Sequence, residues 1–328
     1  MVSLTTYNTR PRTGISCSPK LLALVLSYLI LSYLVYYHFH LHHSTNLPPN
    51  IIQMFHTGNT AFFSTCNDNY LHHSVTSLLS IRNYLPTASL YIISNNISDT
   101  NLHLLENLNI SLLIADLTML FPKTFEYPLE CFYLFAGPQL LLSKGFEYSV
   151  YVDGDVLCLA NPLEFLPQNL SGVAGVTRGL CKTIFPKHEL NTLQRLFNIP
   201  QSTIKKQPRI QSGVVFFNNK KMESLNFLKR ASDMFLKCLK YGVPRKGDDS
   251  LLALLQLTEL KNDCLYLHPG YNYMSSRPPS IPNLVFIHFV HNKPWNNNTS
   301  SSLSHAWMPY IQKYQDILQS CCSNESSH

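Results

Sequence analysis

The sequence predicts an α/β fold: a mainly parallel central sheet flanked by helices, preceded by one N-terminal transmembrane helix. From Ala61 onward, short apolar runs rich in β-branched and aromatic residues alternate with stretches of helical periodicity. Such alternation is typical of a parallel sheet that is covered on both faces. An uncharged apolar run near the N-terminus predicts the membrane helix.

Six runs are predicted to form strands and five to form helices. The strands are expected at 61–66, 89–93, 110–114, 148–152, 213–217 and 284–288. The helices are expected near 70–84, 101–108, 130–143, 222–241 and 248–258. Periodicity is clearest in the fourth helix, where apolar residues recur at spacings of three and four: Leu225, Leu228, Ala231, Phe235 and Leu239. Because ligands of parallel sheets bind at the carboxyl ends of the strands, residues that follow strands are the first candidates for a site.

The predicted membrane helix, 21–41, contains 21 residues and no Asp, Glu, Lys or Arg. At about 1.5 Å per residue it would be about 31 Å long, enough to cross a hydrocarbon core of about 30 Å. A buried core helix rarely runs this long without a charge. A cleaved signal peptide would end in small residues, whereas bulky aromatic residues close this run, so we expect an uncleaved signal anchor. The basic residues Arg10, Arg12 and Lys20 would keep the N-terminal end cytosolic.

The sequence therefore divides into a cytosolic tail (1–20), the anchor (21–41), a stem (42–59), a folded domain (60–296) and a C-terminal tail (297–328). We expect a single-pass type II protein of the Golgi (or ER) membrane, with its folded domain in the lumen. Eight cysteines beyond the anchor permit disulfides there. Asn-x-Ser/Thr sequons, which favour a glycoprotein, occur at Asn96, Asn109, Asn169, Asn297, Asn298 and Asn324.

The charge composition narrows the range of partners. Charged residues make up 13% of the chain, below the roughly 25% of average soluble proteins, and the net charge of +6 is spread along the sequence. This distribution lacks the basic stripe of a nucleic-acid-binding protein, so we expect no nucleic-acid partner.

The strongest local feature is Asp153-Gly154-Asp155, which directly follows the predicted strand 148–152. Two carboxylates at the carboxyl end of a strand suit Mn²⁺ or Mg²⁺, with phosphate oxygens completing the coordination shell. The alternative is a simple turn, but the buried apolar strand before it favours the metal site. At the end of another predicted strand, the imidazole of His288 is a candidate third ligand, and Lys293 could offer its ammonium group to a diphosphate.

Two further segments are candidates for the site. Gln211, Ser212 and Gly213 introduce a predicted strand, and the glycine would allow a ligand to approach the backbone closely. Asp248 and Asp249 begin a predicted helix, where acidic residues usually act as N-caps.

In order and spacing, these segments resemble glycosyltransferase family eight, the glycogenin-like family with the GT-A fold, over about 60–296. The matching segments are AFFSTCNDNY, the Asp-Gly-Asp turn, QSGVVFFN, GDDSLL and HFVHNKPW. The resemblance implies that Cys66, Asn67 and Tyr70 contact the base and ribose of a UDP-sugar. It further implies that Gln211, Ser212 and Gly213 line the sugar site, and that Lys293 assists at the diphosphate. Asp153, Asp155 and His288 would then bind Mn²⁺ (or Mg²⁺).

Five departures from the family pattern are visible. Gln211 stands where the family usually has Asn, and Asp249 where it has Gln. The loop from His288 to Lys293 is one residue shorter, and His291 replaces its Gly. Phe135 occupies a position where the family commonly has a basic residue that touches the donor.

The resemblance implies a retaining glycosyltransferase that moves a hexosyl or N-acetylhexosaminyl group from a UDP-sugar to a glycan or glycoprotein. The transferred sugar stays open among glucose, galactose, N-acetylglucosamine and xylose. Retention requires either a carboxylate nucleophile or front-face attack guided by the leaving phosphate, and the catalytic candidates are Asp248 and Asp249. The motif match favours Asp248 for binding and positioning the sugar, and it leaves open whether Asp249 is a nucleophile.

Two alternatives remain. In a haloacid dehalogenase-like phosphatase, Asp153 would be the nucleophile and Asp155 the general acid. That motif usually lies on the first strand of its domain, whereas about ninety residues of strand and helix pattern precede it here. The second alternative is a non-catalytic sugar-binding relative, which Phe135 and the shortened loop would support.

Overall fold

The computed structural model describes residues 56–122, 127–164, 166, 170–243, 247–276, 281, 283–290, 293–295, 307–312 and 316. The chain divides into two units, Met1–Gln53 and Met54–His328, and the described residues all belong to the second. The predicted anchor, 21–41, lies outside the described residues. Within the described ranges, no helix is both long and apolar enough to cross a membrane.

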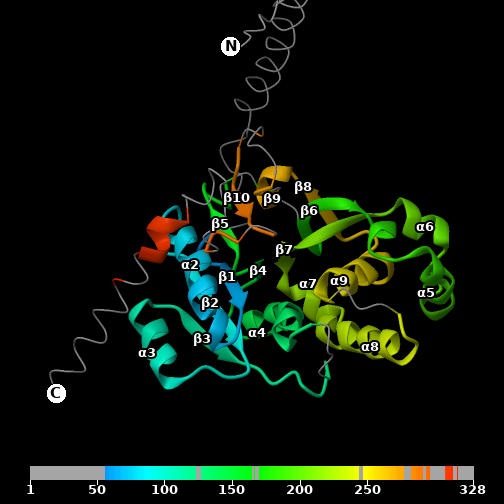
Figure 1. The fold of residues 1–328 in the computed structure, drawn as a ribbon, viewed down its shortest axis with the longest axis horizontal. Helices are drawn as coiled ribbons and strands as arrows, with labels where there is room; N and C mark the ends of the chain where they lie inside the picture. The colour runs from blue at the N-terminus through cyan, green and yellow to red at the C-terminus, as the bar shows by residue number, and fades with distance from the viewer. Residues whose placement is uncertain are drawn as a thin grey trace, which may run out of the picture. The chain divides into compact units, whose positions relative to one another are not determined.

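A seven-stranded sheet forms the centre of the described unit, with strand order β3-β2-β1-β4-β7-β6-β8 (Figure 1). The strands are β1 (Thr60–Thr65), β2 (Ser89–Ser94), β3 (Ser111–Ile114), β4 (Tyr148–Val152), β6 (Val173–Leu180), β7 (Pro208–Asn218) and β8 (Cys264–Leu267). β1 runs parallel to β2 and β4, β2 to β3, and β6 to β8. Only β7 is antiparallel to its neighbours, β4 and β6. The predicted α/β fold with a mainly parallel sheet is therefore confirmed.

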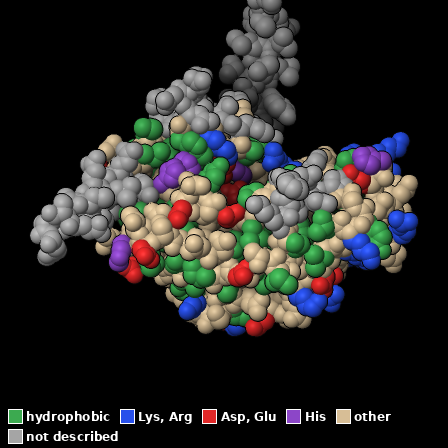
Figure 2. All heavy atoms as spheres, turned by 60° about the horizontal axis from the view of Figure 1, so that its bottom comes forward, with side chains coloured by type: hydrophobic (Ala, Val, Ile, Leu, Met, Phe, Trp, Pro, Cys, Tyr) green, Lys and Arg blue, Asp and Glu red, His purple; other side chains and the backbone are tan. Residues whose placement is uncertain are grey.

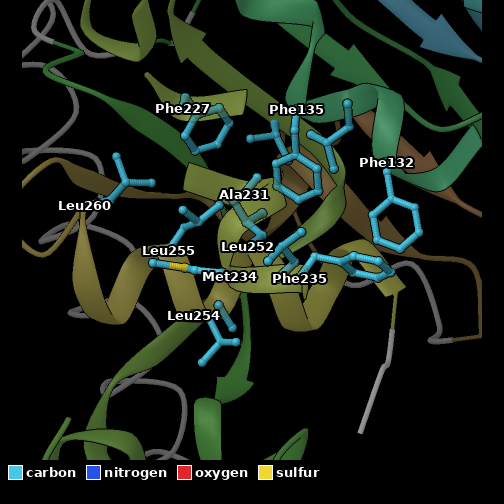
Figure 3. Close-up of a cluster of buried hydrophobic side chains, with 14 of the residues drawn as sticks. Phe132, Phe135, Phe227, Ala231, Met234, Phe235, Leu252, Leu254, Leu255 and Leu260 are labelled. Atoms are coloured by element: carbon cyan, nitrogen blue, oxygen red, sulfur yellow. The ribbon is translucent and has the colours of Figure 1, made fainter. Parts of the chain in front are cut away.

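Helices cover both faces of this sheet because its central strands are apolar on both sides. In β1, Phe62 belongs to one buried cluster, whereas Ala61 and Phe63 belong to the other, as the alternation of a strand requires. The first cluster packs under α2 (Leu71–Arg82) and α3 (Asp99–Asn107). The second packs against η2 (Leu129–Phe135), α4 (Gly137–Leu142), α8 (Phe227–Lys240) and α9 (Gly247–Thr258). Figure 3 shows phenylalanine and leucine side chains of this second cluster pointing toward one another.

Two predicted helices are each divided in two. The segment predicted as a helix at 130–143 forms η2 and then α4, and Pro138 at the start of α4 explains the break, because proline cannot continue a preceding helix. The segment at 222–241 forms α7 (Asn219–Ser224) and α8, with Asn226 between them in the left-handed conformation (φ 51°). α5 (Leu190–Phe197), α6 (Gln201–Lys206), β6 and β8 were not predicted.

A second, three-stranded sheet brings His288 to the aspartates. The predicted strand 284–288 forms β10 (Phe286–His288), which lies between β5 (Val156–Cys158) and β9 (Tyr273–Met274). Since β5 directly follows the Asp-Gly-Asp turn and pairs with β10 in antiparallel register, His288 lies opposite Val156.

Part of the segment predicted as a C-terminal tail packs on the domain. Trp307 is fully buried and its ring lies against Phe289 and Trp295, at centroid distances of 5.6 and 5.7 Å. The hydroxyl of Tyr310 accepts a hydrogen bond from Asn83. The six cysteines within the described ranges are all free, so no disulfide is formed among them.

Candidate active site

Asp153, Asp155 and His288 form a compact cluster of potential metal ligands at the carboxyl end of β4. One ligand atom from each residue lies within 4.8 Å of the others. Nε2 of His288 is 3.5 Å from Oδ2 of Asp153 and 3.2 Å from Oδ1 of Asp155. Two carboxylate oxygens and an imidazole nitrogen are a suitable donor set for Mn²⁺. In Figure 2, acidic and histidine side chains lie beside one another in a hollow of the surface.

The three groups strongly influence one another's ionisation. Burial raises the pKa of Asp153, and the nearby negative charge of Asp155 raises it further. Burial also opposes ionisation of Asp155, but the charges and hydrogen bonds of His288 and Lys293 outweigh it and lower the pKa of Asp155. For His288, burial favours the neutral ring, yet Asp155 and Asp153 raise its pKa. Positive charge is therefore stabilised at this position, as a cation site requires.

Other side chains hold the cluster in place. The hydroxyl of Tyr151 donates a 2.5 Å hydrogen bond to Oδ1 of Asp153, and burial raises the pKa of Tyr151, so it keeps its proton. Nδ1 of His288 lies 3.0 Å from Oδ1 of Asn272 and 3.1 Å from Nε2 of Gln211. We assign the ring proton to Nδ1, donating to Asn272, which leaves the lone pair of Nε2 facing the carboxylates.

A cleft of about 300 Å³ opens beside the cluster and contains several of the predicted donor-binding residues. Cys66, Asn67, Tyr70 and Lys293 line it together with both aspartates. Two aromatic residues with no predicted role, His73 and Trp295, also line it and stack at 3.5 Å between ring centroids. The structure thus brings the predicted nucleotide and diphosphate residues into one cleft.

The residues of this cleft differ in their burial and in their hydrogen-bond and ion-pair partners. Cys66 is buried, and burial raises the pKa of its thiol to about 12, so it is a neutral group. The Asn67 amide donates to Glu130 at 3.0 Å, whereas the ring of Tyr70 is 60% exposed. The Lys293 ammonium group pairs with Oδ2 of Asp155.

Gly213 adjoins the histidine of the cluster. A Cβ atom at this position would lie 2.2 Å from Cε1 of His288 and 3.1 Å from Oδ2 of Asp153. The glycine was predicted to let a ligand approach the backbone, but the side chain that approaches it most closely is His288. Only glycine permits this contact between β7 and β10.

The acidic pair lies in the first turn of α9, where helix N–H groups favour carboxylates. Asp249 accepts hydrogen bonds from the backbone N–H and the hydroxyl of Ser212, both at 3.1 Å, and pairs with Arg209 at 2.9 Å. Burial, Asp249 and Asp153 together raise the pKa of Asp248 to about 8. The two neighbouring aspartates therefore differ: Asp249 has a cationic partner, whereas Asp248 is influenced by the carboxylate of Asp153.

Several site residues were not predicted. Tyr151 precedes Asp153 by two residues, so it shares a strand face with it, and this spacing was a usable signal. Trp295 belongs to the matched HFVHNKPW segment. For Arg209 and Asn272 the sequence offers no comparable signal, because their partners lie 40 and 16 residues away.

Phe135 is a core residue. It is fully buried and packs near Phe121 and Phe227, as Figure 3 shows for Phe227. The position at which a donor-binding cation was considered therefore contributes to folding and not to the surface of the cleft.

The fold and the Asp-Asp-His cluster beside a cleft define a protein of the GT-A glycosyltransferase type. The model of glycosyl transferase family 8 matches residues 61–299, and the chain belongs to this family. This membership decides against the phosphatase alternative, in which His288 would have no role.

Solved structures show the same fold. The galactosyltransferase LgtC, in complex with donor and acceptor sugar analogs, has a TM-score of 0.57 at 14% identity, over 77% of this chain and 95% of that chain. GlyE of Streptococcus pneumoniae has a TM-score of 0.53 at 17% identity, over 81% and 63% of the two chains. The bifunctional glycosyltransferase WbbM has a TM-score of 0.57 at 18% identity, over 83% and 52%. A comparison with curated protein sequences finds no match.

Proposed function

We propose that this protein is a metal-dependent retaining glycosyltransferase that moves a sugar from a UDP-sugar to a glycan or glycoprotein acceptor in the secretory pathway. The observation that carries the proposal is the Asp153, Asp155 and His288 cluster next to the cleft lined by Cys66 and Tyr70. A negatively charged cluster beside such a cleft suits a nucleoside diphosphate bound through a cation.

In this proposal, Asp153, Asp155 and His288 hold Mn²⁺ or Mg²⁺. A bound divalent cation neutralises the charge that develops on a leaving diphosphate. Tyr151 and Asn272 orient the ligands through the hydrogen bonds described above.

The nucleotide would occupy the cleft. The exposed ring of Tyr70 offers an apolar face to the base, and Asn67 and Cys66 lie beside it. The ammonium group of Lys293 forms an ion pair with Asp155. It would become available to a diphosphate oxygen once a bound cation balances that carboxylate.

The transferred sugar would lie toward the start of α9. We assign Asp248 to binding and positioning it, with Gln211 and Ser212 of β7 beside the same site. Asp249 is less suited to act as a nucleophile, because Arg209 and Ser212 occupy its carboxylate oxygens. This supports front-face attack guided by the leaving phosphate over a covalent intermediate on Asp249.

The proposed location rests on the sequence. The uncharged run 21–41 would anchor the protein in the Golgi (or ER) membrane, with the basic N-terminal flank in the cytosol. The catalytic domain would then face the lumen, where glycoprotein and glycan acceptors are modified.

UDP release tests the activity. The purified protein with Mn²⁺ and a panel of UDP-sugars is expected to release UDP from at least one donor, and Asp153→Asn is expected to abolish the release. Asp233→Asn removes an exposed carboxylate on α8 and serves as the matched control. UDP-sugar binding without turnover across a broad acceptor panel would instead identify a non-catalytic relative.

A further inference from the structure

A second cavity, of about 480 Å³, lies against the face of the site that Gln211 and Asn272 form. Its volume is within the range of about 300–1,000 Å³ that is usual for small-molecule sites. It shares no lining residue with the donor cleft, yet His288 contacts residues of both. We propose that this cavity binds the acceptor, and that the acceptor sugar carries an anionic group, a carboxylate or a phosphate, next to Arg178 and Arg209. The proposal rests on the proposed function.

The lining of the cavity is positively charged. It includes the arginines Arg178 and Arg209 but no Asp or Glu. Across the described ranges, no carboxylate lies within ion-pair distance of Arg178. Arg209 is only 6% exposed, and its ion pair with Asp249 uses Nη1. A guanidinium group has five N–H donors and matches carboxylate and phosphate oxygens in pairs.

The hydrogen-bonding groups of the wall point to the same ligand class. Two side-chain atoms of lining residues are buried without a hydrogen-bond partner, Nε of Arg209 and Nδ2 of Asn272, and both are donors. Because buried donors are normally paired, this wall is short of acceptors. The oxygens of an anion would accept hydrogen bonds from these donors, and its charge would balance the arginines. A neutral sugar hydroxyl would accept a hydrogen bond but would not balance the charge.

The order of residues along β7 assigns the cavity to the acceptor. Gly213 adjoins His288 and Asp153, Gln211 contacts His288 and lines the cavity, and Arg209 lies one step farther from the cluster. The residues expected to hold the nucleotide line the other cavity. A ligand in the second cavity therefore lies next to Gln211, which is proposed to line the sugar site, and does not overlap the nucleotide, as an acceptor requires.

Paired ligands that differ only in charge test the proposal. The full-length chain, with Mn²⁺ and saturating UDP to occupy the donor cleft, is titrated with methyl β-glucuronide and methyl β-glucoside. A second pair is glucose 6-phosphate and glucose, with inorganic phosphate as a further probe. We expect the acidic member of at least one pair to bind about tenfold or more tightly than its neutral twin, and the difference to shrink at high salt.

Variants then locate the effect. Arg178→Met is expected to remove the preference for the acidic ligand, and Arg178→Lys to restore part of it. Arg195→Met, an exposed arginine on α5, is the matched control and keeps the full preference. Comparison of the glucuronide with glucose 6-phosphate shows which anion is recognised. If inorganic phosphate binds as tightly as glucose 6-phosphate, the sugar contributes nothing to the affinity.

Several outcomes overturn the proposal. Equal binding of acidic and neutral ligands, no binding of any of them, sugar-independent phosphate binding, or an unchanged preference in Arg178→Met would each do so. Preferential turnover of UDP-glucuronate over UDP-glucose would move the anion to the donor. UDP binding is measured first in the same samples, so failure of the proposed function is seen separately from failure of the anionic subsite.

Discussion

Nη1 of Arg209 lies 2.9 Å from Oδ2 of Asp249, and the other oxygen of that carboxylate accepts two hydrogen bonds from Ser212. Family relatives usually carry Gln where this chain has Asp249. A Gln side chain could accept from Ser212 but could not balance the buried charge of Arg209. The change from amide to carboxylate is therefore explained by its arginine partner, and under the proposed function Asp248 is the acidic residue that positions the sugar.

This difference predicts unequal effects of removing the two carboxylates. Asp248→Asn is expected to lower kcat by about 10²–10³, the effect of losing one contact made in the transition state. Asp249→Gln is expected to lower kcat less. It should also reduce the free energy of unfolding by up to about 3 kcal/mol, because Arg209 loses its partner. UDP release and urea denaturation measure the two effects. A larger loss of kcat in Asp249→Gln would contradict the assignment.

The raised pKa of Asp248 predicts a dependence of stability on pH. The pKa is about 8 in the folded chain, against about 3.9 for an unfolded Asp. Between these values the unfolded state has released the proton that the folded state keeps, so Asp248 lowers stability increasingly as pH rises. Asp248→Asn is therefore expected to melt at the same temperature as the wild type near pH 4 and several degrees higher near pH 8. Thermal unfolding in EDTA measures this, and a difference independent of pH would argue against it.

The hydrogen bond between His288 and Asn272 predicts a role for this asparagine in metal binding. Removing a residue that orients a metal ligand typically weakens metal affinity by about 10–100-fold. We expect this loss in Asn272→Ala, measured by Mn²⁺ titration with electron paramagnetic resonance. Asn191→Ala, at an exposed position of α5, is the control and should bind Mn²⁺ like the wild type. Unchanged affinity in Asn272→Ala would show that His288 is not a ligand or needs no orientation.

The burial of Phe135 predicts that its truncation affects folding and not donor recognition. Phe135→Ala should reduce the unfolding free energy by about 3–5 kcal/mol. The KM for the UDP-sugar should stay unchanged in the fraction that remains folded. Tyr241→Ala, which truncates a half-exposed ring, should change stability by less than about 0.5 kcal/mol. A raised KM with unchanged stability would indicate that Phe135 contacts the donor.

The proposed lumenal location predicts N-glycosylation at two described sequons. Asn96 and Asn109 are both exposed, so an oligosaccharide could be attached to the folded chain. Expression in a eukaryotic cell should yield glycopeptides at both sites by mass spectrometry. Deleting residues 1–41 should abolish them, because the chain would stay in the cytosol. Absence of glycan from all sequons of the full chain would argue against a lumenal domain.

The parts of the fold that the sequence predicted are those with strong local signals. The strand before Asp153 is buried along its whole length and apolar except for Ser149, and its position in a parallel sheet follows from the alternation of strands and helices. β8, by contrast, is an edge strand of four residues, of which only Leu267 is buried, so it has no apolar pattern to recognise.

The candidate site was predictable to the same extent. Asp153 and Asp155 follow a strand, His288 ends one, and all three match family motifs. Arg209 lies before the start of a predicted strand, and its role depends on its contact with Asp249 of α9. The role of Asn272 likewise depends on its contact with His288 of β10. Such contacts depend on tertiary packing and leave no periodic trace in the sequence.

β7 also sets the distance between the metal-ligand cluster and the arginine of the second cavity. Gly213 and Arg209 lie four residues apart in β7, and an extended backbone separates positions at this spacing by about 13 Å. A side-chain substitution cannot alter this interval, and inserting a residue would turn every following side chain to the opposite face. In the acceptor site proposed above, the backbone of β7 would set the distance between the recognised charge and the reacting sugar, so substitutions would change which charge is recognised more readily than how far it lies from that sugar.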